Sequence, residues 1–335
     1  MMDQYMLEIR DLYVYFRVYE GISRVIDGVS LDVRKGERVG LAGETGCGKT
    51  VTMKTVMGAL KIPPAIIPKG EVILDGQNVL KMSAKQLLQM KGTKVSMIFQ
   101  DPMNALNPVF AVGTQLFDVI RFSNRHTSNG GKLSKKEILN RAIAALDEVR
   151  LPDPKRILNS YPLELSGGMR QRVLIAMALV NGPSFLIADE PQTALDVTIG
   201  AQILDLLSEL VRTKGISVLL ITHNLGVIQE TTERVNIMYA GQVAETAPTA
   251  LLFENPKHPY SQGLLASVPR LTGGEIAEGI RGMVPDYTAV PSGCRFHPRC
   301  DHALPICSQK KPPLLLVEPD HLVGCWLYAK EGDAE

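Results

Sequence analysis

Residues 43–50 have the types and the spacing of a loop that binds phosphate. They read GETGCGKT and match the pattern G-x-x-x-x-G-K-[ST], between a short apolar stretch and a helical one. Glycines let successive backbone N–H groups turn toward phosphate oxygens, and the start of a helix adds positive potential. We expect Lys49 to reach the β- and γ-phosphates of a nucleotide and the Thr50 hydroxyl to ligate Mg²⁺. The nucleotide-binding residues predicted in this loop are Gly43, Glu44, Thr45, Gly46, Cys47, Gly48, Lys49 and Thr50.

Two adjacent carboxylates form a second candidate group. The apolar residues 185–188 are followed by Asp189 and Glu190. A buried strand that delivers Asp189 beside Thr50 would complete the ligands of Mg²⁺. Glu190, one residue further along, would then polarise a water that attacks the γ-phosphate.

A third group is Ser166, Gly167 and Gly168, which precede an amphipathic helix. Free backbone N–H groups, a serine hydroxyl and a helix start again favour an anion. A second phosphate-binding helix start has no use in a lone phosphate loop. We therefore expect it to cap the γ-phosphate held by another subunit.

The cysteines divide into one and four. Cys47 lies in the phosphate loop, where it is either a redox-sensitive thiol or, as we prefer, a small side chain that leaves binding to the backbone. The remaining four gather near the C-terminus and suggest a metal site, because cytosolic thiols stay reduced. They lack the short paired spacings of structural zinc sites, so the pattern leaves both zinc and an iron–sulfur cluster open. The predicted ligands are Cys294, Cys300, Cys307 and Cys325.

The surrounding elements alternate between strands and helices, which predicts an α/β fold with a mostly parallel sheet. Residues 101–182 are expected to be mainly helical, with an exposed loop at 124–132. Strands are expected at 7–10, 12–16, 25–33, 38–42, 70–76, 95–99, 185–188 and 216–221, and helices at 51–60, 135–149 and 173–180.

The composition of the sequence changes near residue 255, after which prolines become frequent. Prolines recur from residue 256 to residue 319, so we predict one domain over 1–255 and a loop-rich extension over 256–335. The extension needs a stabilising cross-link, such as a metal site, to order it.

Composition excludes several classes of protein. The 335 residues carry 36 Lys and Arg against 35 Asp and Glu, a net charge of +1, which argues against nucleic acid as a partner. No apolar run approaches the length of a membrane span, and residues 1–10 lack the apolar segment of a secretory signal. We expect a cytoplasmic protein.

These motifs, in this order, resemble the ATP-binding cassette ATPases of membrane transporters over about residues 7–255. The resemblance implies a P-loop NTPase with a RecA-like parallel-sheet core, an antiparallel β subdomain and a helical subdomain. It implies that Phe16 stacks on adenine and that Gln100 senses Mg²⁺ and water. It also makes 166–168 the signature loop, 193–196 the D-loop, and His223 the switch residue that contacts the γ-phosphate.

Three positions depart from the family pattern. Gln192 stands where Thr or Ser is usual, Asn224 where Asp is usual, and Cys47 where Ser or Gly is usual. None removes a charge or hydroxyl that hydrolysis requires.

The extension resembles the C-terminal region of oligopeptide and dipeptide importer ATPases. The resemblance rests on residues 258–260, HPY, and residues 291–300, PSGCRFHPRC. In that family the region carries a four-cysteine [4Fe-4S] site, which the resemblance implies here for the four cysteines. We expect His297, His302 and His321 to be surface or supporting groups, and Trp326 to pack against the cysteine loop.

The resulting hypothesis is an ATP-hydrolysing subunit at the cytoplasmic face of the membrane that drives uptake of dipeptides or oligopeptides. Two such domains would close head to tail around ATP, with Glu190 and His223 as the catalytic residues. The implied partners are a second ATPase chain, usually a paralogue, two transmembrane permease subunits and an extracytoplasmic peptide-binding protein. Residues 101–108 are expected to meet the permease.

Three alternatives remain at this point. The same machine could import nickel or another small solute. A soluble cassette of the DNA-repair or translation type would need a coiled-coil insertion or two tandem cassettes, and the sequence has neither. An iron–sulfur redox enzyme would need an open iron and a flavin or nicotinamide fingerprint.

Overall fold

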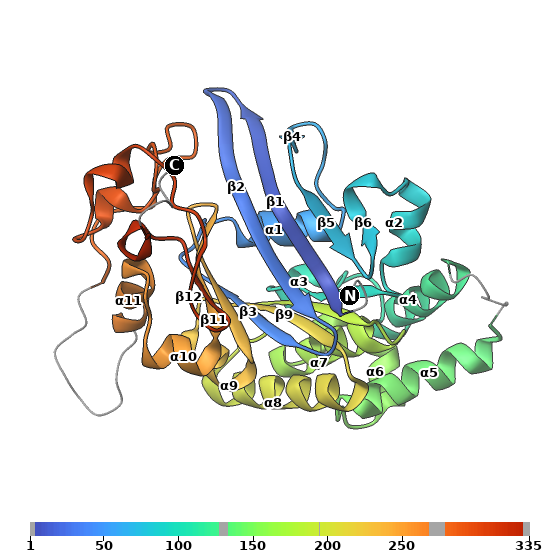
Figure 1. Ribbon diagram of the computed structural model, residues 1–335. Coiled ribbons are helices and arrows are strands. Elements are labelled where there is room, and N and C mark those ends of the chain that lie inside the picture. The colour runs from blue at the N-terminus through green and yellow to red at the C-terminus, as the bar shows by residue number, and fades with distance from the viewer. Residues whose placement is uncertain (1–3, 127–132, 194, 268–278, 331–335) are drawn as a thin grey trace. The chain divides into compact units, whose positions relative to one another are not determined.

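The computed structural model describes residues 4–126, 133–193, 195–267 and 279–330 (Figure 1). The chain forms two compact units. The first contains the chain up to Arg34, Arg38–Leu80 and everything from Leu220 onward, and the second contains Lys35–Glu37 and Lys81–Leu219. Of the loop predicted at 124–132, residues 124–126 end helix α4, and 127–132 lie outside the described residues.

An antiparallel sheet occupies one part of the first unit (Figure 1). Its order is β2-β1-β5-β6, with β4 also paired to β1. The two strands predicted at 7–10 and 12–16 form one strand that continues through a β-bulge at Asp11. At this shift in register Asp11 adopts φ 44°, and its N–H donates to Ser30 Oγ. The bounds are β1 (Tyr5–Val18), β2 (Gly21–Arg34), β4 (Ala65–Ile66), β5 (Glu71–Leu74) and β6 (Gln77–Asn78).

The phosphate loop belongs to a second group of strands in this unit, ordered β12-β13-β11-β10-β3. Strand β3 runs parallel to β10, and the other neighbours are antiparallel. Four of the five residues of β3 are buried, which agrees with the apolar strand expected before the loop. The bounds are β3 (Arg38–Ala42), β10 (Arg234–Tyr239), β11 (Gln242–Pro248), β12 (Leu315–Glu318) and β13 (His321–Val323).

Helix α1 starts at the last residues of the phosphate loop. It begins directly after Gly48, whose φ of 108° favours glycine, and it ends before Gly58, which has φ 55°. It is therefore shifted from the predicted 51–60. The helices of the first unit are α1 (Lys49–Val56), α9 (Leu225–Thr231), α10 (Thr249–Glu254) and α11 (Pro259–Ala266).

The second unit is mainly helical around two parallel buried strands, β7 and β8. Helix α7 starts well before the predicted 173–180, because Ser166 caps its first turn by accepting from Met169 N–H. The elements are α2 (Ala84–Met90), β7 (Val95–Ile98), α3 (Pro102–Ala105), α4 (Val112–His126), α5 (Lys135–Glu148), α6 (Pro154–Asn159), α7 (Gly167–Leu179), β8 (Phe185–Asp189) and α8 (Val197–Lys214). Strand β9 (Ser217–Ile221) contains the point where the chain passes back to the first unit.

None of the helices described is both long and apolar enough to cross a membrane.

The described part of residues 256–330, which we call the C-terminal extension, is tied to β11 by a buried carboxylate. Glu245 is fully buried, and its carboxylate accepts the backbone N–H groups of Lys257 and His258. Its Oε1 also lies 2.6 Å from Nε2 of His321, a fully buried residue of β13. These contacts fix the start of the extension and strand β13 to β11, and so help to order a proline-rich segment that has a small core of its own.

We expect Glu245→Ala to lower the free energy of unfolding by about 3–5 kcal/mol, because a buried imidazole and two backbone N–H groups lose their acceptor. Chemical denaturation of the full chain measures this. The control Glu233→Ala removes an exposed partner of Arg38, 3.1 Å away, and should cost less than about 1 kcal/mol. Equal losses for the two variants would contradict the role of Glu245 as an anchor.

Candidate nucleotide-binding site

The phosphate loop is shaped by positions where only glycine fits. Gly43 has φ 150°, and a Cβ there would lie 2.1 Å from the carbonyl oxygen of Met238. Gly46 and Gly48 also adopt positive φ. Lys49 is buried, and its Nζ donates to the carbonyl oxygens of Gly43 at 2.6 Å and Glu44 at 3.0 Å. The lysine thus folds back over the loop.

Cys47 is a buried thiol. Its side chain is fully inaccessible, and burial raises its pKa. A protonated, inaccessible thiol reacts poorly. This favours the interpretation of Cys47 as a small side chain and not as a redox sensor.

In the second unit, Glu190 is held by two side chains. Its Oε2 accepts from Gln100 Nε2 at 2.8 Å and from Thr193 Oγ1 at 2.9 Å. Glu190 also has φ 45°, an uncommon value for a non-glycine residue and one found often at functional sites. Asp189, the last residue of β8, is buried. The sequence predicted that Gln100 and Glu190 act in the same hydrolysis reaction. It did not predict that Thr193 helps to orient the Glu190 carboxylate.

The signature loop presents its serine at the surface. Ser166 is exposed and caps α7, and Gly168 is packed so that a Cβ would lie 2.7 Å from Ile199 Cγ2. Asp196 of the predicted D-loop caps α8 by accepting from Ile199 N–H. Ala194, in the same segment, lies outside the described residues.

Two further predicted residues lie in the first unit. Phe16 is half-buried on β1, where it pairs with Ala65 of β4. His223 is exposed between β9 and α9. Asn224 caps α9 by accepting from Gly226 N–H, a function that asparagine performs as well as the usual aspartate.

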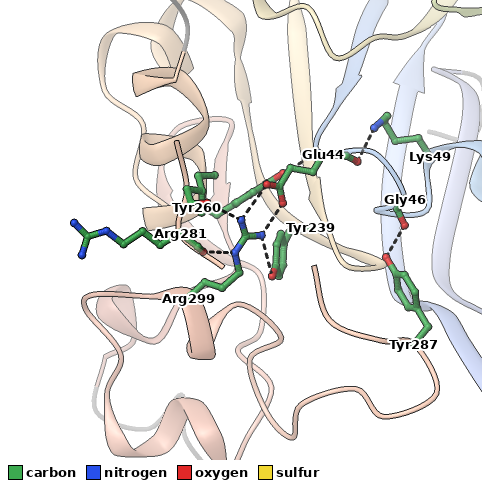
Figure 2. A network of polar contacts seen from close by, with 9 residues as sticks. Glu44, Gly46, Lys49, Tyr239, Tyr260, Arg281, Tyr287 and Arg299 are labelled. Atoms are coloured by element: carbon green, nitrogen blue, oxygen red, sulfur yellow. Dashed lines mark hydrogen bonds and ion pairs between the residues drawn. The ribbon is translucent and has the colours of Figure 1, made fainter. Parts of the chain in front are cut away.

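The C-terminal extension contacts the phosphate loop at three points (Figure 2), which sequence reasoning missed. Tyr260 Oη accepts from Glu44 N–H at 2.9 Å, and Tyr287 Oη donates to the Gly46 carbonyl at 2.7 Å. The guanidinium of Arg299 binds both carboxylate oxygens of Glu44. No local signal could have revealed contacts between residues more than two hundred positions apart.

Tyr260 is itself positioned by the residue two before it. His258 Nδ1 accepts from Tyr260 N–H at 3.0 Å and so caps α11. His258 is buried, and this burial lowers its pKa to about 4. The imidazole is therefore neutral at physiological pH, as an acceptor must be.

The four C-terminal cysteines share one region but do not form a ready ligand group. Burial raises the pKa values of Cys294 and Cys325 to about 11, and the other thiols of the set add to both shifts. Within the described residues, no three Cys, His, Asp or Glu side chains are grouped so that they could hold a metal ion. As placed, the thiols do not fit a metal cluster without rearrangement.

The three nearby histidines differ in their surroundings. His302 is exposed, and His297 Nδ1 lies 2.8 Å from the carbonyl oxygen of Cys294. His321 is not a surface group, because it is fully buried against Glu245. Trp326 is buried, and its indole N–H donates to the carbonyl of Lys310.

Comparison with known proteins agrees with this geometry. Residues 26–193 match the family model described as "ABC transporter". The chain is similar to an ATP-binding cassette solved as a dimer with ADP and phosphate, MJ0796, at TM-score 0.63 and 28% identity over 73% of this chain and 99% of that one. It is also similar to CbiO1 of Clostridium perfringens, at TM-score 0.62 and 25% identity over 75% and 92%. The chain belongs to the ATP-binding cassette family, whose transporter subunits are ATPases coupled to transport.

More specific similarities concern peptide transport. Residues 244–307 match the model for the C-terminal region of oligopeptide/dipeptide transporters. A probable peptide ABC transporter ATP-binding protein of Sinorhizobium fredii is 44% identical over 96% of this chain and 94% of its own length. The dipeptide transport ATP-binding protein DppD of Bacillus subtilis has the same identity and coverage.

His258 should make the protein less stable in mild acid. Its pKa is near 4 when folded and near 6.5 when unfolded, so the unfolded chain binds the proton first as pH falls. Above about pH 6.5 this difference in pKa costs no stability. As the pH falls from there toward 4, it lowers the free energy of unfolding, by about 2 kcal/mol between pH 7 and pH 5.

Urea unfolding at pH 7 and pH 5 measures this loss. His258→Asn keeps a side-chain acceptor for α11 but cannot titrate, so it should lose about 2 kcal/mol less over the same interval. Equal losses in the wild type and the variant would contradict the assignment.

Proposed function

We propose that this chain is the ATP-hydrolysing subunit of an ABC importer that powers uptake of dipeptides or oligopeptides. The observation that carries the proposal is the presence, in one chain, of a cassette match at 26–193 and an oligopeptide/dipeptide transporter match at 244–307. Relatives similar over 96% of the chain are named for peptide and dipeptide transport.

In this proposal the first unit binds the nucleotide. Residues 43–50 surround the phosphates with backbone N–H groups, and Lys49 leaves its carbonyl partners to neutralise the β- and γ-phosphates. Thr50, Gln100 and Asp189 would hold Mg²⁺, which would neutralise charge on the phosphate oxygens. Phe16 stacks on the adenine.

The catalytic step belongs to Glu190 and His223. Glu190 accepts a proton from, or orients, the water that attacks the γ-phosphate in line, and Gln100 and Thr193 fix its carboxylate. His223 contacts the γ-phosphate. Ser166, Gly167 and Gly168 cap the same phosphate on a second ATPase chain, which is a paralogue in our proposal, so that ATP closes a head-to-tail dimer and hydrolysis opens it.

The permease contact is proposed for the segment after Gln100. Exposed apolar side chains lie in and beside residues 101–108, and a partner would cover them. Met103 lies within this segment and is 47% exposed, and Phe99, Val109 and Phe110 flank it and are 53%, 70% and 51% exposed. Two transmembrane permease subunits would hold the chain at the cytoplasmic face of the membrane, and import would also need an extracytoplasmic peptide-binding protein.

We also propose a [4Fe-4S] cluster on Cys294, Cys300, Cys307 and Cys325, with zinc as the alternative. Support comes from an all-cysteine set without zinc-type spacing in the C-terminal extension. Thiols with raised pKa values keep their protons at neutral pH, so metal binding would release protons and reorganise the loop.

An importer of nickel or another small solute is the alternative within transport. Co-purification of the intact complex and identification of the ligand on its binding protein separates the two. A bound peptide supports the proposal, and a bound metal or other solute contradicts it.

Glu190→Gln should reduce ATP turnover at least about 100-fold while ATP binding survives, since the amide cannot accept the proton. Turnover by the full complex and ATP binding to the chain are the two measurements. Glu209→Gln, on an exposed carboxylate of α8, is the matched control and should leave both unchanged. Normal hydrolysis by Glu190→Gln would remove Glu190 from this role.

Anaerobically purified protein should show the visible absorption of a thiolate-bound iron–sulfur cluster. Cys325→Ser should weaken or abolish it. Stoichiometric zinc without visible absorption would select the alternative, and protein that binds neither metal would contradict a metal site.

A further inference from the structure

Glu44 places a carboxylate inside the loop that is proposed to receive a triphosphate. Its backbone forms part of the loop, and its side chain is 27% exposed. A negative charge carried by this loop would oppose the binding of a triphosphate by ordinary Coulomb repulsion, all the more because its side chain is partly shielded from water. The loop therefore needs either a different residue or a nearby cation.

The C-terminal extension supplies that cation. Arg299 Nη1 lies 2.7 Å from Glu44 Oε2, and Arg299 Nη2 lies 3.1 Å from Oε1. This two-pronged geometry is the strongest form of an arginine–carboxylate pair. The side chain of Arg299 is only 5% exposed, so salt and water screen the pair less than they screen a surface pair.

Arg299 is held in place by groups other than Glu44. Its Nε donates to the carbonyl of Arg281 at 2.8 Å, and Nη2 donates to that of Ile280 at 3.2 Å (Figure 2 shows the first of these). The guanidinium also lies over the ring of Tyr239, 5.6 Å from its centre. The arginine is thus oriented toward Glu44 before any nucleotide arrives.

The same extension holds the loop backbone on both sides of this pair. Tyr260 Oη accepts Glu44 N–H, and Tyr287 Oη donates to the carbonyl of Gly46. Tyr260 is fully buried. The loop is therefore fixed at one backbone N–H, one carbonyl and one carboxylate by residues of the extension.

We propose that Arg299 is a positioning residue for ATP binding: it neutralises Glu44 and fixes the phosphate loop in its binding shape. This inference rests on the proposed role of residues 43–50 in binding ATP. It gives the C-terminal extension a direct part in nucleotide affinity, transmitted through one ion pair and two tyrosine hydroxyls.

The test is a double-mutant cycle on the full chain, with Mg²⁺-ATP binding measured by calorimetry and KM and kcat measured in the complex. Arg299→Gln leaves Glu44 unpaired and should weaken ATP binding about tenfold. The loss should lie in KM more than in kcat, and it should shrink at high salt. Arg299→Lys keeps the charge and should keep most of the affinity. Glu44→Gln together with Arg299→Gln should bind within about threefold of the wild type, because no unpaired charge remains.

Arg38 and Glu233 provide the matched control cycle. They form an exposed pair in the same unit, 3.1 Å apart, and R38Q, E233Q and their combination should each leave ATP affinity within about twofold.

Wild-type affinity in R299Q, or a double variant as weak as R299Q, would overturn the inference. If R299Q folds poorly, the double variant still tests the inference, because a loss of tenfold or more in a protein with no unpaired charge at this pair overturns it. Lys49→Ala separates this outcome from the proposed function. Unchanged ATP binding in K49A would refute the loop as the nucleotide site, whereas loss in K49A with none in R299Q would refute only the role of Arg299.

Discussion

A loop that binds phosphate with its own backbone must hold its N–H groups in one arrangement, because every ligand bond depends on that shape. Here the shape of the loop is fixed both by residues of the loop itself and by residues of the C-terminal extension. Inside, Gly43 approaches the carbonyl of Met238 too closely for any Cβ, and Lys49 folds over the loop. Outside, the extension fixes Glu44 and Gly46. Much of the first unit serves to bring these partners together.

The chain of support for the loop begins at Glu245, a buried residue of β11. Glu245 fixes the backbone at His258, His258 caps the helix that carries Tyr260, and Tyr260 receives Glu44 N–H. Arg299 directly precedes Cys300, so whatever orders the cysteine segment also orders the arginine. This arrangement explains why the extension is physically coupled to the nucleotide loop although it contributes no residue of the motifs that define the cassette.

Sequence reasoning located the local motifs and failed on distant contacts. The apolar strand before residues 43–50, the helix that follows them and the helix start at 166–168 follow from short-range rules of spacing, and the structure confirms these elements. Two strands were predicted within residues 7–16 because a polar residue inside a β-bulge, here Asp11, has the same sequence pattern as a break between strands. Arg299, Tyr260 and Tyr287 were missed as partners of the loop, because only the fold brings them to Glu44 and Gly46. The buried place of His321 was missed for the same reason.

Amide hydrogen exchange of the nucleotide-free chain tests most directly whether the loop is held in shape before ATP binds. If the loop is held in shape beforehand, the amides of Glu44 and Cys47, which donate to Tyr260 Oη and to the Glu44 carbonyl, should exchange far more slowly than those of an open surface loop, and Mg²⁺-ATP should add only modest further protection to these two. Exchange of these amides at the rate of an unstructured peptide, followed by strong protection when ATP is added, would contradict it.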